Sequence, residues 1–197
     1  MSKSERTKAF IIETVAPIFN RSGFSAMSLS KITAATGLTK GAIYGHFENK
    51  EELAIESFKF SVRKVLKDLN KTVNKGETPL EMLKNIAVFY EDYYEYNKQF
   101  GGCPILNIGV DANNQNKVIT QLVQSYNHRI LERFSQLIEK AKETNEIKKS
   151  IDSMLYAKRF FYMIEGAVYM THIMKDDSYL KDVSAVLQQI IKQELQQ

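Results

Sequence analysis

Apolar residues recur at intervals of three and four along nearly the whole chain, a spacing that predicts helices rather than strands. The first helix is expected from about Ser4 to Ser22, and the last begins at Asp177 or Ser178. No stretch alternates apolar and polar residues over the length of a strand. Gly and Pro, which mark turns, number only nine and three among 197 residues, so long elements are expected. The predicted fold is all-α, with about nine helices.

Start and stop signals are clearest between residues 28 and 47, SLSKITAATGLTKGAIYGHF. Ser28 and Thr39 are residue types whose hydroxyls cap helix starts, and Gly37 suits the left-handed backbone that often ends a helix. The segment therefore predicts two short helices joined by a turn of three or four residues. This is the helix-turn-helix geometry, in which the second helix enters the major groove of DNA.

Similar signals predict the other helices. They are expected from Asn49 past Leu66, from Thr78 to Gly101, from Pro104 through Val110, from about Gln115 to Thr144, and from Ser150 or Asp152 to about Met174. Asn49 with Glu52 resembles a capping box, and Thr78-Pro79-Leu80-Glu81 combines three start signals. Pro17 lies inside the first helical pattern, where it removes a backbone hydrogen bond and predicts a bend or a frayed end.

Packing within the helix-turn-helix determines which residues face outward. Ile32, Leu38 and Ile43 can hold the two helices together. The residues expected to contact DNA are Ser28, Thr39, Lys40, Gly41, Tyr44, His46 and Lys50. Hydroxyl and ammonium groups donate to phosphate oxygens, and a glycine lets the backbone approach the duplex closely. Each residue also has a structural alternative: a helix cap, a solvated lysine, a tyrosine at the edge of the core, or a histidine facing its own helix carbonyls.

Charge is distributed unevenly along the chain. Residues 1–47 hold six Lys and Arg against two Glu, so they carry the whole formal excess of +4, and the remaining residues are balanced. Such a concentration favours contact with a polyanion, although a mildly basic solvated surface would have the same composition.

Residues 6–53 resemble the DNA-binding domain of TetR/AcrR-type transcriptional regulators. The resemblance rests on Phe19, Gly23, Phe24, the Ser28–Ile32 helix, Gly37, Thr39-Lys40-Gly41-Ala42-Ile43-Tyr44, Phe47, Lys50 and Leu53. It implies a DNA-binding domain over residues 1–50 and a helical ligand-binding and dimerisation domain over residues 51–197. It also implies a regulator, more often a repressor than an activator, that binds a near-palindromic operator in double-stranded DNA as a homodimer and is released by a small effector.

Aromatic and polar side chains are frequent in the middle helices, a composition found both in cores and in small-molecule sites. The candidate effector-binding residues are Tyr90, Tyr94, Cys103, His128, Phe161 and Glu165. Aromatic richness suggests a hydrophobic or planar effector. Glu165 needs a partner in its apolar surroundings, which Arg159, Lys158 or a ligand would supply. Cys103 precedes a helix start, where a thiol can become reactive, but most free cysteines are small buried apolar residues.

The last helix carries adjacent apolar pairs, Val186-Leu187 and Ile190-Ile191, which form a wider stripe than one partner helix would cover. We therefore expect the last two helices to form a four-helix homodimer interface with two-fold symmetry. The alternative is that they close a monomeric domain.

Composition argues against several other classes. One cysteine excludes an internal disulfide framework, the longest uncharged stretch is Gln99–Val110, and the N-terminal residues lack an apolar signal core, so a cytoplasmic protein without membrane contact is expected. No phosphate-binding, dinucleotide or hydrolase motif occurs, and the three histidines are far apart. We expect no cofactor, no metal and no enzymatic activity. An all-helical enzyme and a protein-interaction module that binds no DNA are the alternatives, which metal analysis and a salt-dependent DNA titration would distinguish.

Overall fold

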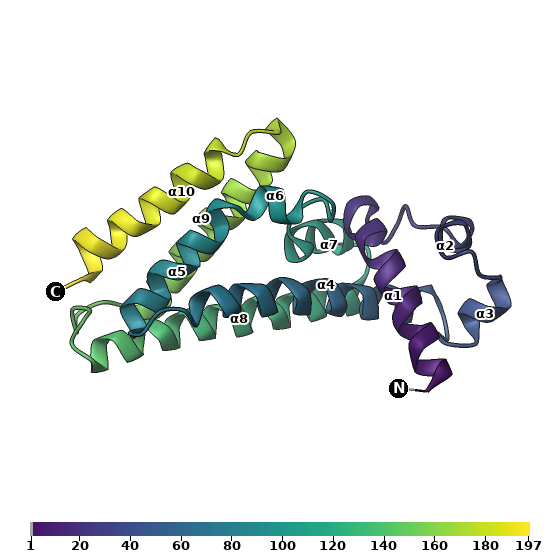
Figure 1. Ribbon diagram of the computed structural model, residues 1–197, viewed down its shortest axis with the longest axis horizontal. Coiled ribbons are helices and arrows are strands. Elements are labelled where there is room, and N and C mark those ends of the chain that lie inside the picture. Colours follow the sequence, from purple (N-terminus) through teal and green to yellow (C-terminus); the bar gives the residue numbers. More distant parts are fainter. Residues whose placement is uncertain (1) are drawn as a thin grey trace. The chain divides into compact units, whose positions relative to one another are not determined.

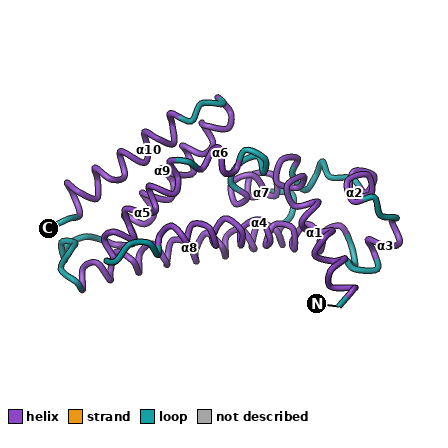
Figure 2. Tube along the Cα trace, viewed as in Figure 1, coloured by secondary structure: helices purple, strands orange, loops and turns teal. Residues whose placement is uncertain are grey.

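The computed structural model describes residues 2–197 and is all-α, as predicted (Figure 1). The helices are α1 Lys3–Ser22, α2 Leu29–Thr36, α3 Lys40–Tyr44, α4 Lys50–Val73, α5 Pro79–Glu91, α6 Tyr93–Asn97, α7 Pro104–Ala112, α8 Lys117–Glu143, α9 Ser153–Met174 and α10 Ser178–Ile190, followed by a π-helical turn at Ile191–Leu195. Figure 2 shows these helices joined by short loops, and within residues 2–197 the only β pairing is an isolated bridge between Ile147 and Gln196.

Side-chain caps set most helix starts. Ser28 accepts from the Lys31 N–H at 3.3 Å and Thr39 from the Ala42 N–H at 3.2 Å. Gly37 ends α2 with a φ of 67°, in the left-handed region. At the start of α9 the cap is Asp152, which accepts from the Leu155 N–H at 2.9 Å. These local hydrogen bonds explain why the boundaries of the helix-turn-helix could be predicted.

The structure differs from the prediction in the division of one helix and in the capping of another. The helix expected from Thr78 to Gly101 is divided at Asp92 into α5 and α6, which gives ten α-helices in the described chain rather than about nine. No Gly or Pro marks this break. At the start of α4, Asn49 caps the Glu52 N–H at 2.9 Å, but the Glu52 carboxylate accepts from the Glu48 N–H and not from Asn49. The end of α1 at Ser22 agrees with the prediction, and Pro17 lies inside the helix.

The chain forms two compact units that are not contiguous in sequence. The first comprises Met1–Val65 and Gln99–Val123, and the second comprises Leu66–Lys98 and Gln124–Gln197. Long helices α4 and α8 each contribute residues to both units. The core of the first unit includes Ile11, Val15, Phe19, Met27, Ile32, Ile43, Phe47 and Leu53, all buried. Ile32 and Ile43 thus hold the helix-turn-helix together as expected, and Leu38 is half-buried.

In the second unit, α10 packs against both α5 and α9. Leu180, Val183 and Leu187 of α10 are buried there. The wide apolar stripe of the last helix is therefore covered largely within the chain, because it has two neighbouring helices rather than one. Within residues 2–197, no helix combines the length and the apolar character that spanning a bilayer requires.

Candidate functional site

The second helix of the helix-turn-helix, α3, exposes one polar face. Lys40, Gly41 and Tyr44 are exposed, whereas Ile43 points into the core. The Lys40 ammonium lies 5.9 Å from the centre of the Tyr44 ring, so both side chains lie on the same side of the helix. Lys40 has no carboxylate partner within residues 2–197. This face therefore presents an uncompensated positive charge beside a phenolic hydroxyl, which suits phosphate binding.

Gly41 lies in the middle of this face. A Cβ built on Gly41 would have no atom of the chain within 4 Å. The packing of the protein therefore does not require a glycine there, and the open space leaves room for close approach of another molecule.

Ser28 and Thr39 are exposed, and both cap helices, so any contact with DNA would be made by hydroxyls that already accept a backbone hydrogen bond. His46 is half-buried just after α3. Its backbone N–H donates to the Ile43 carbonyl at 3.0 Å.

Lys50, in the first turn of α4, is half-buried against an aromatic ring. Its ammonium lies 4.4 Å from the centre of the Phe24 ring. Burial lowers the pKa of Lys50, and the charge of the Asp111 carboxylate partly offsets this. The residue is thus held near the turn between α1 and α2 rather than extended into solvent.

The structure separates the basic residues of the first 47 positions into engaged and available ones. Lys8 pairs with Glu52 at 3.2 Å, the Lys31 ammonium donates to the Ala26 carbonyl at 3.0 Å, and Arg21 donates to the Gln99 carbonyl. Charge counting from the sequence therefore overstates the number of cations available to a polyanion. Of the two lysines predicted to contact DNA, Lys40 is exposed and makes no such bond within residues 2–197, whereas Lys50 lies against Phe24.

Residues from the middle of the chain fix the end of α1. Asn20, which is 3% exposed, donates to the carbonyls of Phe100 and Gly102 at 2.5 and 2.9 Å. In return, the Asn107 amide on α7 donates to the Asn20 carbonyl at 3.1 Å and to the Gly101 carbonyl at 2.7 Å. Two carboxamides thus join α1, the loop before α7, and α7 itself.

The turn that leads into α2 is held by Asp111 of α7. Its carboxylate accepts from the Phe24 N–H at 2.6 Å and the Ser25 N–H at 3.3 Å. Gly23 has a φ of 78°, and a Cβ there would lie 2.6 Å from this carboxylate. No pattern in the sequence indicated the contacts of Asp111, because Phe24 and Ser25 are 87 and 86 residues away from it.

Replacing Asp111 by Ala should lower the free energy of unfolding by about 1–3 kcal/mol, because two backbone N–H groups lose a charged acceptor. Urea unfolding followed by circular dichroism would measure this change. Asp182→Ala, at an exposed position on α10, is the matched control and should leave the midpoint nearly unchanged. An equal midpoint for both variants would contradict a role of Asp111 in holding the turn.

The residues predicted to bind an effector lie in separate environments. Tyr90 is buried in a cluster with Phe89 and Tyr93, each with its ring centre 5.2 Å away. Tyr94 is half-buried, with its ring 5.2 Å from that of His172, whose pKa is lowered by burial. His128 is exposed, and its Nδ1 lies 2.8 Å from the Gln124 carbonyl of its own helix.

Of the remaining candidates, Phe161 and Glu165 are half-buried one turn apart on α9, and Cys103 is buried at the start of α7 in the first unit. Glu165 makes an interaction within the chain. The six residues therefore remain individual predictions and do not line one described cavity. Within residues 2–197, no group of three His, Cys, Asp or Glu side chains is placed to hold a metal ion.

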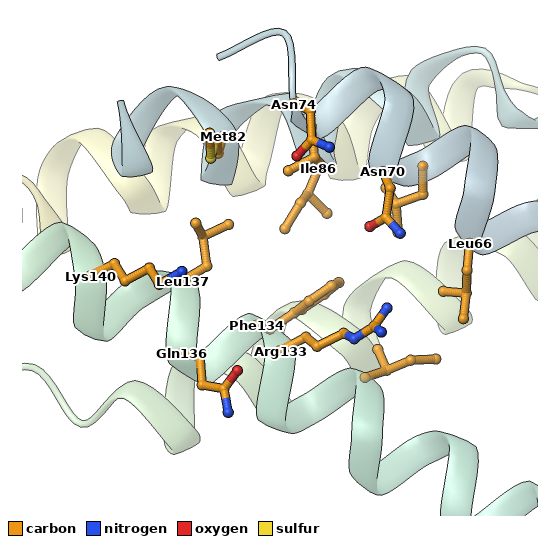
Figure 3. Close-up of a pocket in the computed structure, with 13 residues that line it drawn as sticks. Leu66, Asn70, Asn74, Met82, Ile86, Arg133, Phe134, Gln136, Leu137 and Lys140 are labelled. Atoms are coloured by element: carbon orange, nitrogen blue, oxygen red, sulfur yellow. The ribbon is translucent and has the colours of Figure 1, made fainter. Parts of the chain in front are cut away.

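A cavity of about 320 Å³ lies in the second unit between α4, α5 and α8, and we call it the α4–α5–α8 groove (Figure 3). Its apolar lining is Leu66, Leu69, Val73, Met82, Ile86, Ile130, Phe134 and Leu137, and its polar lining is Asn70, Asn74, Arg133, Gln136 and Lys140. None of the six predicted effector residues lines it. The available signal was the seven-residue spacing of Arg133 and Lys140, which places both on one face of a helix.

Comparison with known proteins gives the same architecture along the chain. A TetR-family transcriptional regulator from Cytophaga hutchinsonii is 32% identical, with a TM-score of 0.90 over 98% of this chain and 96% of its own. A TetR transcriptional regulator from Chloroflexus aurantiacus J-10-FL is 28% identical, with a TM-score of 0.95 over 100% of this chain and 99% of its own.

Among curated proteins, the uncharacterized HTH-type transcriptional regulator YerO of Bacillus subtilis (strain 168) is 32% identical over 95 residues, which make up 45% of this chain and 32% of YerO. The match thus spans about a third of that regulator. The family described as bacterial regulatory proteins, tetR family, matches residues 11–56, and the tetracyclin repressor-like C-terminal domain matches residues 79–187. These two matches cover the helix-turn-helix and most of the remaining helices, and the chain therefore belongs to the TetR family of bacterial regulatory proteins.

Proposed function

We propose that this protein is a ligand-responsive transcriptional repressor that acts by binding rather than by catalysis. Residues 1–50 bind operator DNA, and residues 51–197 bind the effector and dimerise. The observation that carries the proposal is the exposed face of α3, where Lys40 has no carboxylate partner within residues 2–197 and the space beside Gly41 is open. Binding to operator DNA would place the protein in the cytoplasm.

In this proposal α3 lies in the major groove, and most contacts are to phosphates. Lys40 supplies a charge, the hydroxyls of Thr39 and Tyr44 donate hydrogen bonds, and Gly41 lets the helix backbone approach the duplex. Ser28 and the first turn of α2 face the adjacent backbone. Lys50 would have to leave the Phe24 ring to reach a phosphate at the start of α4, where free backbone amides also favour an anion.

We assign the homodimer interface to the last two helices, and within them chiefly to the outer face of α9. Leu155, Tyr162, Tyr169 and Ile173 recur on one side of this helix, and Tyr162 and Ile173 are each 61% exposed. Gly166 lies on the same side, with no atom within 4 Å of a Cβ built there, so a second helix could approach closely. Exposed apolar stripes of this kind commonly mark protein interfaces.

An effector releases the operator if it binds better to a conformation in which the two DNA-binding domains no longer match the half-site spacing. The shift can be no larger than the difference between the effector's affinities for the two conformations. A hydrophobic or aromatic effector would suit apolar side chains such as Ile86 and Phe134, which line a cavity of the second unit.

In vitro selection from random duplexes with the purified protein at physiological salt would test the proposal. An enriched inverted repeat, with half-sites about one helical turn apart, is expected of a two-fold dimer. A folded dimer that enriches no sequence, with or without an added effector, would contradict operator binding.

Lys40→Ala should weaken binding to the selected operator and to unrelated duplexes by a similar factor. It should also lower the slope of log affinity against log salt by about one, since one phosphate contact is lost. Tyr44→Phe should weaken binding without changing the slope, because the phenol carries no charge. Lys192→Ala, at an exposed position near the C-terminus, is the control. Unchanged affinity in both α3 variants would remove these residues from the interface.

A further inference from the structure

The α4–α5–α8 groove has the size and lining of a small-molecule site. Its volume of about 320 Å³ lies at the lower end of the range of ligand pockets, roughly 300–1,000 Å³. The floor of the groove is apolar: it is formed by Leu69, Ile86, Ile130 and Phe134, which are all buried. These side chains come from three helices, so the floor is a contact region of the core rather than a feature of one exposed helix.

One wall of the groove is positively charged. Arg133 and Lys140 lie seven residues apart on α8, which is two helical turns or about 10 Å along the axis. Neither has a carboxylate partner within residues 2–197, and no Asp or Glu lines the groove. The acidic neighbour Glu139 pairs instead with Lys142 at 3.0 Å. Two positive charges therefore border an apolar floor without compensation.

The opposite wall offers hydrogen-bond donors. Asn70 on α4 and Asn74, directly after the end of that helix, both line the groove. Figure 3 shows the Asn70 amide directed across the groove toward α8 and the Arg133 guanidinium extended over the groove from the other side, with Lys140 beside Leu137 toward one end. A carboxamide and a guanidinium on facing walls can donate to different oxygens of one anionic group.

We propose that this groove binds a small amphipathic anion, an apolar chain whose single carboxylate or phosphate headgroup lies between Arg133 and the Asn70 amide. A cation would be repelled by Arg133 and Lys140, and a wholly apolar ligand would gain nothing from the two charges and the two exposed carboxamides, which would stay hydrated. The proposal names the chemical class of the effector and in that respect rests on the proposed function. Binding in the groove can nevertheless be measured without DNA.

Isothermal titration of the full-length protein with three probes of equal chain length tests the proposal: decanoate, decyl phosphate and uncharged decanol. We expect the anions to bind at least about tenfold more tightly than decanol, since they gain charge-assisted hydrogen bonds. Tighter binding of decanoate or of decyl phosphate would identify which headgroup the groove prefers. Decanol binding as tightly as both anions would overturn the proposal.

Variants locate the site. Arg133→Gln combined with Lys140→Gln should weaken binding of the anions about tenfold or more and leave decanol binding unchanged. Arg129→Gln, an exposed arginine on α8 that does not line the groove, is the matched control and should change anion binding less than twofold. Asn70→Trp, at an exposed position on α4, should fill part of the groove and weaken the binding of all three probes. The thermal unfolding midpoint should stay near that of the parent protein.

Anion binding that survives both the double change and Asn70→Trp would contradict the groove as the site. The effect on the selected operator is a separate measurement. Groove-dependent binding of decanoate that leaves the DNA complex intact would support the site and count against its role in release. If decanoate still releases the operator from the double variant, the effector binds in another cavity.

Discussion

Replacing Tyr162 and Ile173 together by Glu should convert the dimer into a monomer and lower operator affinity by about a hundredfold or more. The two side chains are the most exposed members of the apolar stripe on α9. Four carboxylates brought together by the two-fold axis would be desolvated against like charges, which an interface does not tolerate. Each half-site would then bind one protomer independently, and the gain from linking two DNA-binding domains would be lost.

Sedimentation velocity would report the oligomeric state, and titration of a two-half-site duplex would report the affinity. Val88→Glu changes an exposed apolar residue of α5, away from this stripe, and is the matched control; it should remain a dimer. Binding to a single half-site by the double variant should equal that of the parent protein. A double variant that stays dimeric would show that the interface is formed by another face.

Gly41→Ala should leave the fold intact and lower operator affinity at least about tenfold, or 1.4 kcal/mol. Within the chain the added methyl group meets no atom, and alanine favours a helix over glycine by up to about 1 kcal/mol, so stability should be unchanged or slightly higher. On DNA the methyl group would hold α3 away from the duplex and lengthen several hydrogen bonds to phosphates, each contributing about 1 kcal/mol.

A size series at this position separates steric exclusion from unfolding. Gly41→Ser and Gly41→Val should lower affinity progressively, while thermal unfolding midpoints stay within a few degrees of the parent. Ala42→Ser, which alters the adjacent exposed residue by one hydroxyl, serves as the control for a general effect of changing α3. Operator binding that is insensitive to volume at position 41 would mean that DNA does not approach this backbone.

Two kinds of candidate effector residue differ in how far the sequence indicates them. Aromatic composition indicates residues such as Tyr90, which lies in a buried cluster with Phe89 and Tyr93 and stays a prediction. The α4–α5–α8 groove depends on Arg133 of α8 and Asn70 of α4, which are 63 positions apart and ordinary exposed residues when read singly. Only the packing of the helices places them on facing walls.

Features with local causes could be predicted from the sequence. Ser28, Thr39 and Gly37 define the two helices of the helix-turn-helix because a capping hydrogen bond or a left-handed backbone involves residues at most four positions apart. Apolar spacing determined the helical class for the same reason, since a repeat of 3.6 residues is a property of one segment.

Which of these residues remain available to a partner depends on contacts between distant segments of the chain. Lys8 pairs with Glu52, and Lys50 lies against the Phe24 ring. The Asp111 carboxylate accepts from the Phe24 N–H, and α5 and α9 cover the apolar stripe of α10. Each of these contacts depends on the path of the chain between distant segments. A side chain's burial and partners are set by what packs against it, and no pattern within a single helix contains that information.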